Sequence, residues 1–170
     1  MAKSKARKNA PELALVGDVD QWEADTVKAL LELPNGSECT LYFDSAGGNP
    51  YGALAVVMLM RLRRIRATAI VLGECSSSAL LVFAACHRRF TGPFCTFLFH
   101  RIRWQSDKRV LSEEARQWVK HFEQMETDLD NFQHELFGAA QQVTQEWNIQ
   151  GRYVTGREMV AAGLAEMLEA

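Results

Sequence analysis

Three adjacent serines, Ser76 to Ser78, lie where residue types and spacing favour nucleophilic chemistry. They follow an apolar segment typical of a buried strand and precede one typical of a buried helix. A serine on such a turn lies beside the unpaired N–H groups of the helix start, which can stabilise an oxyanion. The same serines could serve only as helix caps, which is their commonest role at this position.

Two further candidates lie at the ends of other apolar segments. Gly47 and Gly48 belong to a glycine turn that follows one strand-like segment, and His100 ends another at 94–99. In parallel sheets the carboxyl ends of strands meet at one edge, where sites gather. We therefore expect Gly48, Ser77 and His100 to lie close together. A neutral histidine there could take the proton of a serine hydroxyl and make it nucleophilic.

The elements that must position these residues alternate between strand and helix patterns. We predict strands at 12–16, 39–43, 67–72 and 94–99, and helices at about 18–33, 51–64 and 79–85. The third strand is expected to end at Gly73, and 86–91 to form a loop. Ser76 is expected to cap the buried helix that follows. This alternation predicts an α/β fold with a parallel sheet.

A long helix is predicted after His100, with Ser112 as its N-cap. Its apolar residues recur at alternating steps of four and three, as in a heptad seam: Trp118, Phe122, Met125, Leu129, Phe132 and Leu136. Such a narrow seam favours a subunit interface over packing within one domain. His121 and His134 fall off the seam and are predicted to face solvent.

Composition limits the classes of protein to consider. The chain has 170 residues, 48% of them hydrophobic, and a net charge of −2. We expect one globular domain at 12–170 and a disordered basic tail at 1–11. No apolar run approaches the ~20 residues of a membrane span, and the tail lacks the apolar core of a secretory signal. The four cysteines lack metal-ligand spacing and are predicted to be free, buried thiols of a cytoplasmic protein, with no cofactor.

From about Leu13 onward the chain resembles the proteolytic subunit of the ATP-dependent Clp protease. That family contains serine peptidases with a crotonase-like spiral of strand–helix units and a protruding handle helix, which here would be 112–137. The matching segments, in chain order, are LYFDSAGG, GECSSSALL, FLFH and RYVTGREMVAAGLAE. Each segment alone is a weak signal, and their order over most of the chain makes the resemblance specific.

This resemblance implies that Ser77 is the nucleophile and His100 the base, with the backbone N–H groups of Gly48 and Ser78 forming the oxyanion hole. It also implies a peptide or unfolded-protein substrate and a homo-oligomeric ring, heptameric or stacked in pairs through the long helix. The family's N-terminal segment, which helps to dock an AAA+ unfoldase, is nearly absent, which argues against that partner. No nucleic-acid or membrane partner is expected.

The family's third triad residue, an aspartate, falls on Gly151. Asn148 is the candidate replacement, with Gln150, water or a backbone carbonyl as alternatives, and Asp107 is interpreted as a solvated loop charge. A bare Ser-His pair should be slow but active, so we expect weak peptidase activity. Two other functions stay open. One is a catalytically silent structural subunit, and the other is an acyl-thioester enzyme, although no pair of acids lies near Gly48 or Ser78 in the sequence.

Overall fold

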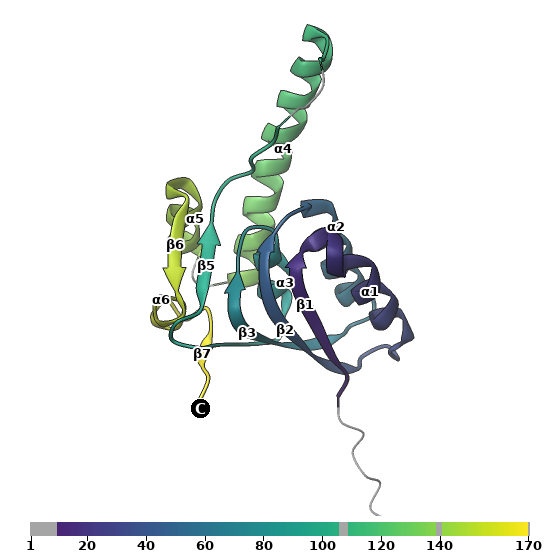
Figure 1. Cartoon of the computed structure of the whole chain (residues 1–170), viewed down its shortest axis with the longest axis vertical. Coiled ribbons are helices and arrows are strands. Elements are labelled where there is room, and N and C mark those ends of the chain that lie inside the picture. Colours follow the sequence, from purple (N-terminus) through teal and green to yellow (C-terminus); the bar gives the residue numbers. More distant parts are fainter. Residues whose placement is uncertain (1–9, 106–108, 139–140, 170) are drawn as a thin grey trace, which may run out of the picture.

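The computed structural model describes residues 10–105, 109–138 and 141–169 (Figure 1). The predicted basic tail lies almost wholly outside these ranges, as does Asp107. The strands are β1 (Glu12–Asp18), β2 (Glu38–Gly47), β3 (Arg66–Cys75), β4 (Arg88–Thr91), β5 (Thr96–Phe99), β6 (Arg152–Thr155) and β7 (Glu166–Met167). The helices are α1 (Val19–Glu32), α2 (Pro50–Leu62), α3 (Ala79–Ala85), α4 (Ser112–Phe137), α5 (Gln141–Gln150) and α6 (Gly156–Ala161).

The sheet is mostly parallel. Its main path runs β1-β2-β3-β4-β7, and every neighbouring pair along this path is parallel. Strand β5 leaves the path: it bridges to β3 at Glu74 and Thr96 and pairs antiparallel with β6. Figure 1 shows α1, α2 and α3 gathered on one side of the β1-β2-β3 sheet. The predicted α/β fold with a parallel sheet is confirmed.

Two strands are longer than the sequence pattern indicated. Strand β2 continues through Ser45 to Gly47, and β3 passes through Gly73 to Cys75, so the prediction that Gly73 ends its strand was wrong. The Asp44 carboxylate accepts the backbone N–H of Glu74 at 3.1 Å and holds the two extensions together. Both strands thereby carry their polar ends into the site.

The segment predicted as a loop contains strand β4, which lies between β3 and β7. Its sequence, Arg88-Arg89-Phe90-Thr91, lacks the apolar pattern of a buried strand. The Arg89 guanidinium is nevertheless accommodated, because it donates to the carbonyls of Leu164 and Ala84 at 2.8 and 2.9 Å. Burial of this guanidinium lowers its pKa. A charged residue can form a strand here only because tertiary partners satisfy it.

Phe83 on α3 is the hub of the aromatic core. Its ring lies 6.0 Å from that of Phe43 on β2, 5.5 Å from Phe97 on β5 and 6.4 Å from Phe137 on α4, measured between ring centroids. Pairs at these separations and tilts add to the free energy gained by burial. Helix α3 therefore ties the two strands to the base of the long helix.

All four cysteines are free and buried, as the sequence predicted. Burial raises the pKa of the Cys39 thiol to about 11 and raises those of Cys75 and Cys86 further. A buried thiol that stays protonated is a poor nucleophile. These residues contribute to the core as small apolar groups.

Helix α4 projects well beyond the sheet (Figure 1) and occupies the range predicted for the long helix. Leu111, not Ser112, is its N-cap. Its base is buried and its outer seam is only half-buried. His134 is 5% exposed, so the prediction that it faces solvent was wrong, because the helix base packs against α3 and α5. Within the described part of the chain, no helix is long and apolar enough to cross a membrane.

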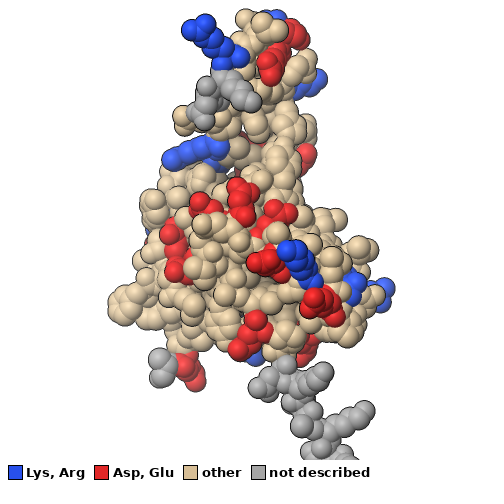
Figure 2. All heavy atoms as spheres, turned by 45° about the vertical axis from the view of Figure 1, so that its right-hand side comes forward, with Lys and Arg blue, Asp and Glu red and all other residues tan. Residues whose placement is uncertain are grey.

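Charged side chains are dispersed over the face shown in Figure 2. Asp and Glu side chains spread across the body, with a few Lys and Arg side chains among them. Among the described residues on this face, no basic tract concentrates positive charge of the kind that attracts a phosphate backbone.

Candidate active site

The serine turn is fixed by three hydrogen bonds to neighbouring strands. The Ser76 N–H donates to the Ser45 carbonyl and the Ser77 N–H to the Leu98 carbonyl, both at 2.9 Å. The Leu98 N–H donates in return to Ser76 Oγ at 2.9 Å. Ser76 is fully buried and holds β5, so its predicted role as a helix cap was wrong. Strand β5 therefore binds the turn through Leu98, two residues before His100.

Ser77 has a left-handed backbone with φ +56°, which is rare for a residue other than glycine. Such conformations persist only where the surroundings enforce them, and they cluster at functional sites. Gly47 packs against the turn: a Cβ on it would lie 2.6 Å from Ser77 Cβ and 2.7 Å from the Ser76 carbonyl oxygen. Only glycine allows this approach. The turn resembles the strained strand-to-helix turn that presents a nucleophilic serine in other hydrolases.

Gly48 and Ser78 lie next to each other at the site. Ser78 Oγ donates to the Gly48 carbonyl at 3.0 Å and joins the glycine turn to the start of α3. Gly48 has φ +127°, a conformation that residues with side chains rarely adopt. The Ala79 N–H is the donor that closes the turn onto Ser76, so the Ser78 N–H precedes the helical hydrogen bonds. The two residues predicted to supply oxyanion donors are therefore in direct contact.

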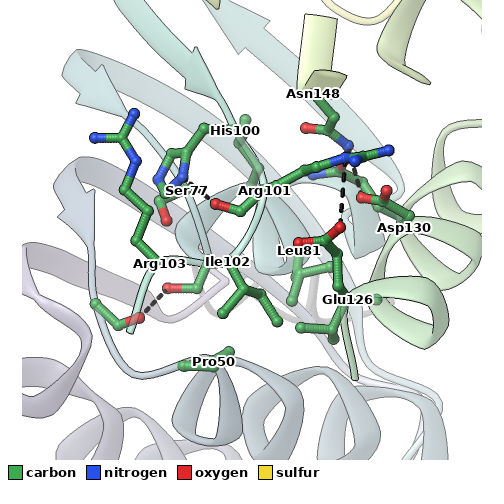
Figure 3. Close-up of a pocket in the computed structure, with 15 residues that line it drawn as sticks. Pro50, Ser77, Leu81, His100, Arg101, Ile102, Arg103, Glu126, Asp130 and Asn148 are labelled. Atoms are coloured by element: carbon green, nitrogen blue, oxygen red, sulfur yellow. Dashed lines mark hydrogen bonds and ion pairs between the residues drawn. The ribbon is translucent and has the colours of Figure 1, made fainter. Parts of the chain in front are cut away.

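His100 follows β5 and lines the same cavity as Ser77, a cavity of about 110 Å³ (Figure 3). Its Nδ1 lies 2.5 Å from the main-chain carbonyl oxygen of Arg101. A carbonyl can only accept, so Nδ1 carries a proton, and in the neutral form of the ring the lone pair is on Nε2. Among the described contacts no hydrogen bond joins Ser77 to His100. Catalytic hydrogen bonds are often long before substrate binds.

Two acids on α4, Glu126 and Asp130, also line the cavity, and sequence reasoning did not place them there. Their spacing of four puts them on one face of the helix, but the sequence does not say where that face points. Arg101 Nε lies 3.4 Å from Glu126 Oε1. Burial raises the pKa of Asp130, and the neighbouring His134 and Arg101 oppose that rise.

Asn148 also lines the cavity, but its amide group is bound to α4. Asn148 Nδ2 donates to Gln133 Oε1 at 2.8 Å and to Asp130 Oδ1 at 3.1 Å. The predicted candidates Gly48, Ser77, Ser78, His100 and Asn148 thus surround one cavity. The proton on His100 Nδ1 is accepted by a backbone carbonyl and not by the Asn148 side chain.

Gly151 lies between α5 and β6, just outside the ladder that joins β5 and β6. The last pair of that ladder is Phe99 with Arg152, so the register extended by one residue sets Gly151 opposite His100. Gly151 has φ +64°, and a Cβ on it would meet no atom within 4 Å. The position is therefore spatially open, although its backbone disfavours most side chains.

These features define a class: an α/β protein with a serine, a histidine and backbone donors at the carboxyl edge of a mostly parallel sheet. The Clp protease family model matches residues 8–169, which is nearly the whole chain. The chain belongs to the Clp protease family, a family of serine peptidases. A search of curated proteins found no match to it.

Proposed function

We propose that this protein is a ClpP-like serine endopeptidase that cleaves unfolded polypeptides or short peptides, with Ser77 as nucleophile and His100 as base. The left-handed backbone of Ser77 carries the proposal. Of the three adjacent serines, only Ser77 has this strained conformation, and contacts with Gly47 and β5 enforce it. A serine that served only as a cap would have no need of that strain.

The proposed chemistry follows the Ser-His pattern. His100 Nε2 takes the hydroxyl proton of Ser77 as Oγ attacks the peptide carbonyl, and the imidazolium returns that proton to the leaving amine. Backbone N–H groups of Gly48 and Ser78 stabilise the oxyanion, and loss of one such donor typically costs about 10²–10³ in rate. Water then hydrolyses the acyl-enzyme. The remaining wall of the cavity includes the apolar residues Leu81, Ile102 and Leu129, which suit an apolar substrate side chain.

Low turnover is part of the proposal. Gly151 offers no carboxylate to stabilise the imidazolium that forms on His100, so the charge stabilisation that a triad aspartate provides is missing. Weak activity on short, unstructured peptides is expected. A catalytically inactive structural subunit is the alternative.

Labelling with a fluorophosphonate tests this proposal, because the reagent modifies only activated serines. Wild-type protein should be labelled on Ser77, and Ser77→Ala should abolish labelling. Ser76→Ala is the matched control: it leaves the buried Leu98 N–H unsatisfied, which costs about 1–3 kcal/mol, but the folded protein should still be labelled. Absence of label on folded wild-type protein, or label that survives Ser77→Ala, would favour the structural subunit.

The proposal includes a cytoplasmic homo-oligomer assembled through α4 as the handle. The outer seam of α4 is half-buried in one chain, and a groove of about 360 Å³ lined by Leu54, Met58 and Phe132 runs between α2 and α4. A lone chain would leave these apolar surfaces in water. Light scattering should show particles larger than one chain at micromolar concentration, and a monomer would contradict this part. The proposed assembly does not include an AAA+ unfoldase as a partner.

A further inference from the structure

We propose that the main-chain carbonyl of Arg101 is the third member of the catalytic set, and that an ion pair between Arg101 and Glu126 holds this carbonyl against His100. The inference rests on the proposed function for its kinetic consequences. It makes Arg101 and Glu126 positioning residues, because they act on the reaction through the histidine ring.

The first step is the hydrogen bond itself. His100 Nδ1 and the Arg101 carbonyl oxygen are 2.5 Å apart, so Nδ1–H must be the donor. This bond fixes the tautomer whose Nε2 can accept the Ser77 proton. A carboxylate does the same in a Ser-His-Asp triad, where the wrong tautomer costs about 10⁴ in rate. A carbonyl supplies this tautomer without supplying a negative charge.

The second step concerns what holds the carbonyl. Residues 101–105 follow β5 without helix or strand, so no ladder of hydrogen bonds fixes the Arg101 peptide. The Arg101 side chain instead reaches across the cavity toward Glu126 and Asp130 on α4 (Figure 3). Its Nε lies 3.4 Å from Glu126 Oε1; the Arg101 side chain is 52% exposed and the Glu126 side chain 29% exposed. A partly buried pair is screened by solvent less than a pair at the surface.

The third step concerns the other polar groups around the ring. The Asn148 amide nitrogen donates to Asp130 and Gln133, and among the described contacts no hydrogen bond joins the Asn148 oxygen to His100. Asp130 and Glu126 face Arg101. Arg103 lines the same cavity and brings a second positive charge, not an acceptor. Of the groups that line the described cavity, the Arg101 carbonyl is therefore the one that contacts Nδ1.

A double-mutant cycle tests whether the Arg101–Glu126 ion pair, here called the clamp, holds the carbonyl. The assay is single-turnover acylation of the protein by an activated ester. Arg101→Met and Glu126→Gln should each lower the acylation rate by up to about 10²-fold, the size expected for a misplacement of about 1 Å, with little change in KM. The double variant should be no slower than the slower single variant, because both remove one interaction. The exchanged pair, Arg101→Glu with Glu126→Arg, should recover part of the rate. Independent, additive losses would overturn the clamp.

Arg61→Met is the matched control. It breaks another Arg–Glu pair to the same helix, Arg61 with Glu135 at 2.8 Å, which lies away from the histidine. Its acylation rate should match wild type. An equal loss in this variant would show that any loosening of α4 slows the reaction, and the clamp would be rejected.

Nuclear magnetic resonance of protein with isotope-labelled histidine rings gives a readout that needs no turnover. At mildly alkaline pH, His100 should show the tautomer protonated on Nδ1, and Arg101→Met should give a mixture of tautomers. Protonation on Nε2 in wild type would overturn the inference whatever the labelling result. If Ser77 is not labelled while the Nδ1–H signal is present, the proposed function fails and the carbonyl contact stands.

Discussion

The serine turn and the histidine end of the site are built by opposite means. Ser76 and Ser77 are held by buried backbone hydrogen bonds to β2 and β5, and Gly47 fits against them without room for a methyl group. His100 is held by its neighbour's carbonyl, which in turn depends on one ion pair to α4. One half of the site is rigid because its packing allows one arrangement, and the other half depends on where a helix lies.

This difference predicts which part of the site tolerates substitution. Changes at the serine turn disturb the core of the protein, so they should be costly in both folding and activity. Changes at the histidine end meet open space and half-exposed groups, so they should alter rate while leaving the fold intact. Three predictions test this contrast, in order of decreasing effect.

The largest effect is expected from Gly47→Ala. The new Cβ would overlap Ser77 Cβ and the Ser76 carbonyl, and φ +97° is unfavourable for alanine. Fluorophosphonate labelling should fall by more than about 10²-fold, and the free energy of unfolding by about 1–3 kcal/mol. Labelling rate per folded molecule and urea denaturation measure the two effects.

Gly36→Ala is the control for that change. Gly36 also has a left-handed backbone, φ +78°, but a Cβ there meets no atom within 4 Å. It should lose stability through backbone strain alone and keep the wild-type labelling rate. Equal labelling by both variants would show that the turn is not the rigid half of the site.

A moderate gain in rate is expected from Gly151→Asp. The register extended by one residue sets this position opposite His100, and the space around a Cβ there is open. Aspartate tolerates φ +64° better than most residues. If the Arg101 carbonyl already fixes the tautomer, only the added charge contributes. Single-turnover acylation should then rise about tenfold and not by the 10⁴ that a tautomer correction would give.

Gly163→Asp is a matched control, because its φ of +72° and open surroundings impose similar strain at a position that does not line the cavity. It should be destabilised to a similar extent without any gain in rate. A gain near 10⁴ in Gly151→Asp would mean that the histidine is not held in the correct tautomer in the wild-type protein.

The smallest effect is a pH-dependent change in stability from Asp130→Asn. Because burial raises the pKa of Asp130, the folded state holds this proton more tightly than the unfolded state. The carboxyl group therefore costs stability as pH rises through the interval between its ordinary and raised pKa, and asparagine does not. The melting temperature of the variant relative to wild type should rise by a few degrees from acidic to neutral pH.

Asp128→Asn, on the exposed face of the same helix, should show no such trend. A relative melting temperature of Asp130→Asn that falls with pH would contradict this prediction. It would mean that the attraction between Asp130 and Arg101 outweighs the effect of burial on the Asp130 carboxylate.

The polar residues that follow each strand could be predicted from the sequence, because they and the apolar segments are neighbours in the chain, although β2 and β3 extend further than their apolar patterns indicated. Ser77, Gly48 and His100 were brought together on that basis, and the structure places them around one cavity. Strand β4 was missed because its arginines have partners distant in sequence: the Glu166 carboxylate for Arg88 and the Leu164 carbonyl for Arg89. The same limit applies wherever a residue's environment is supplied by another element.

The long helix shows this limit most clearly. Its bounds follow from its own pattern, but its orientation depends on what it packs against. His134 was therefore predicted to face solvent, although it is buried. For the same reason, the sequence did not show that Glu126 and Asp130 line the cavity. A backbone carbonyl as the partner of His100 stayed one alternative among several, since main-chain atoms leave no signature in a sequence.

The four buried thiols can report local opening of the structure. A thiol reagent can reach Cys39, Cys75, Cys86 or Cys95 only when the chain around it separates, and burial keeps three of them protonated until then. The rate of modification at each cysteine therefore measures the free energy of opening at that place. Cys75 adjoins the serine turn and Cys39 lies on the opposite end of the sheet. Comparing these two rates would show whether the catalytic edge opens by itself or only when the whole protein unfolds.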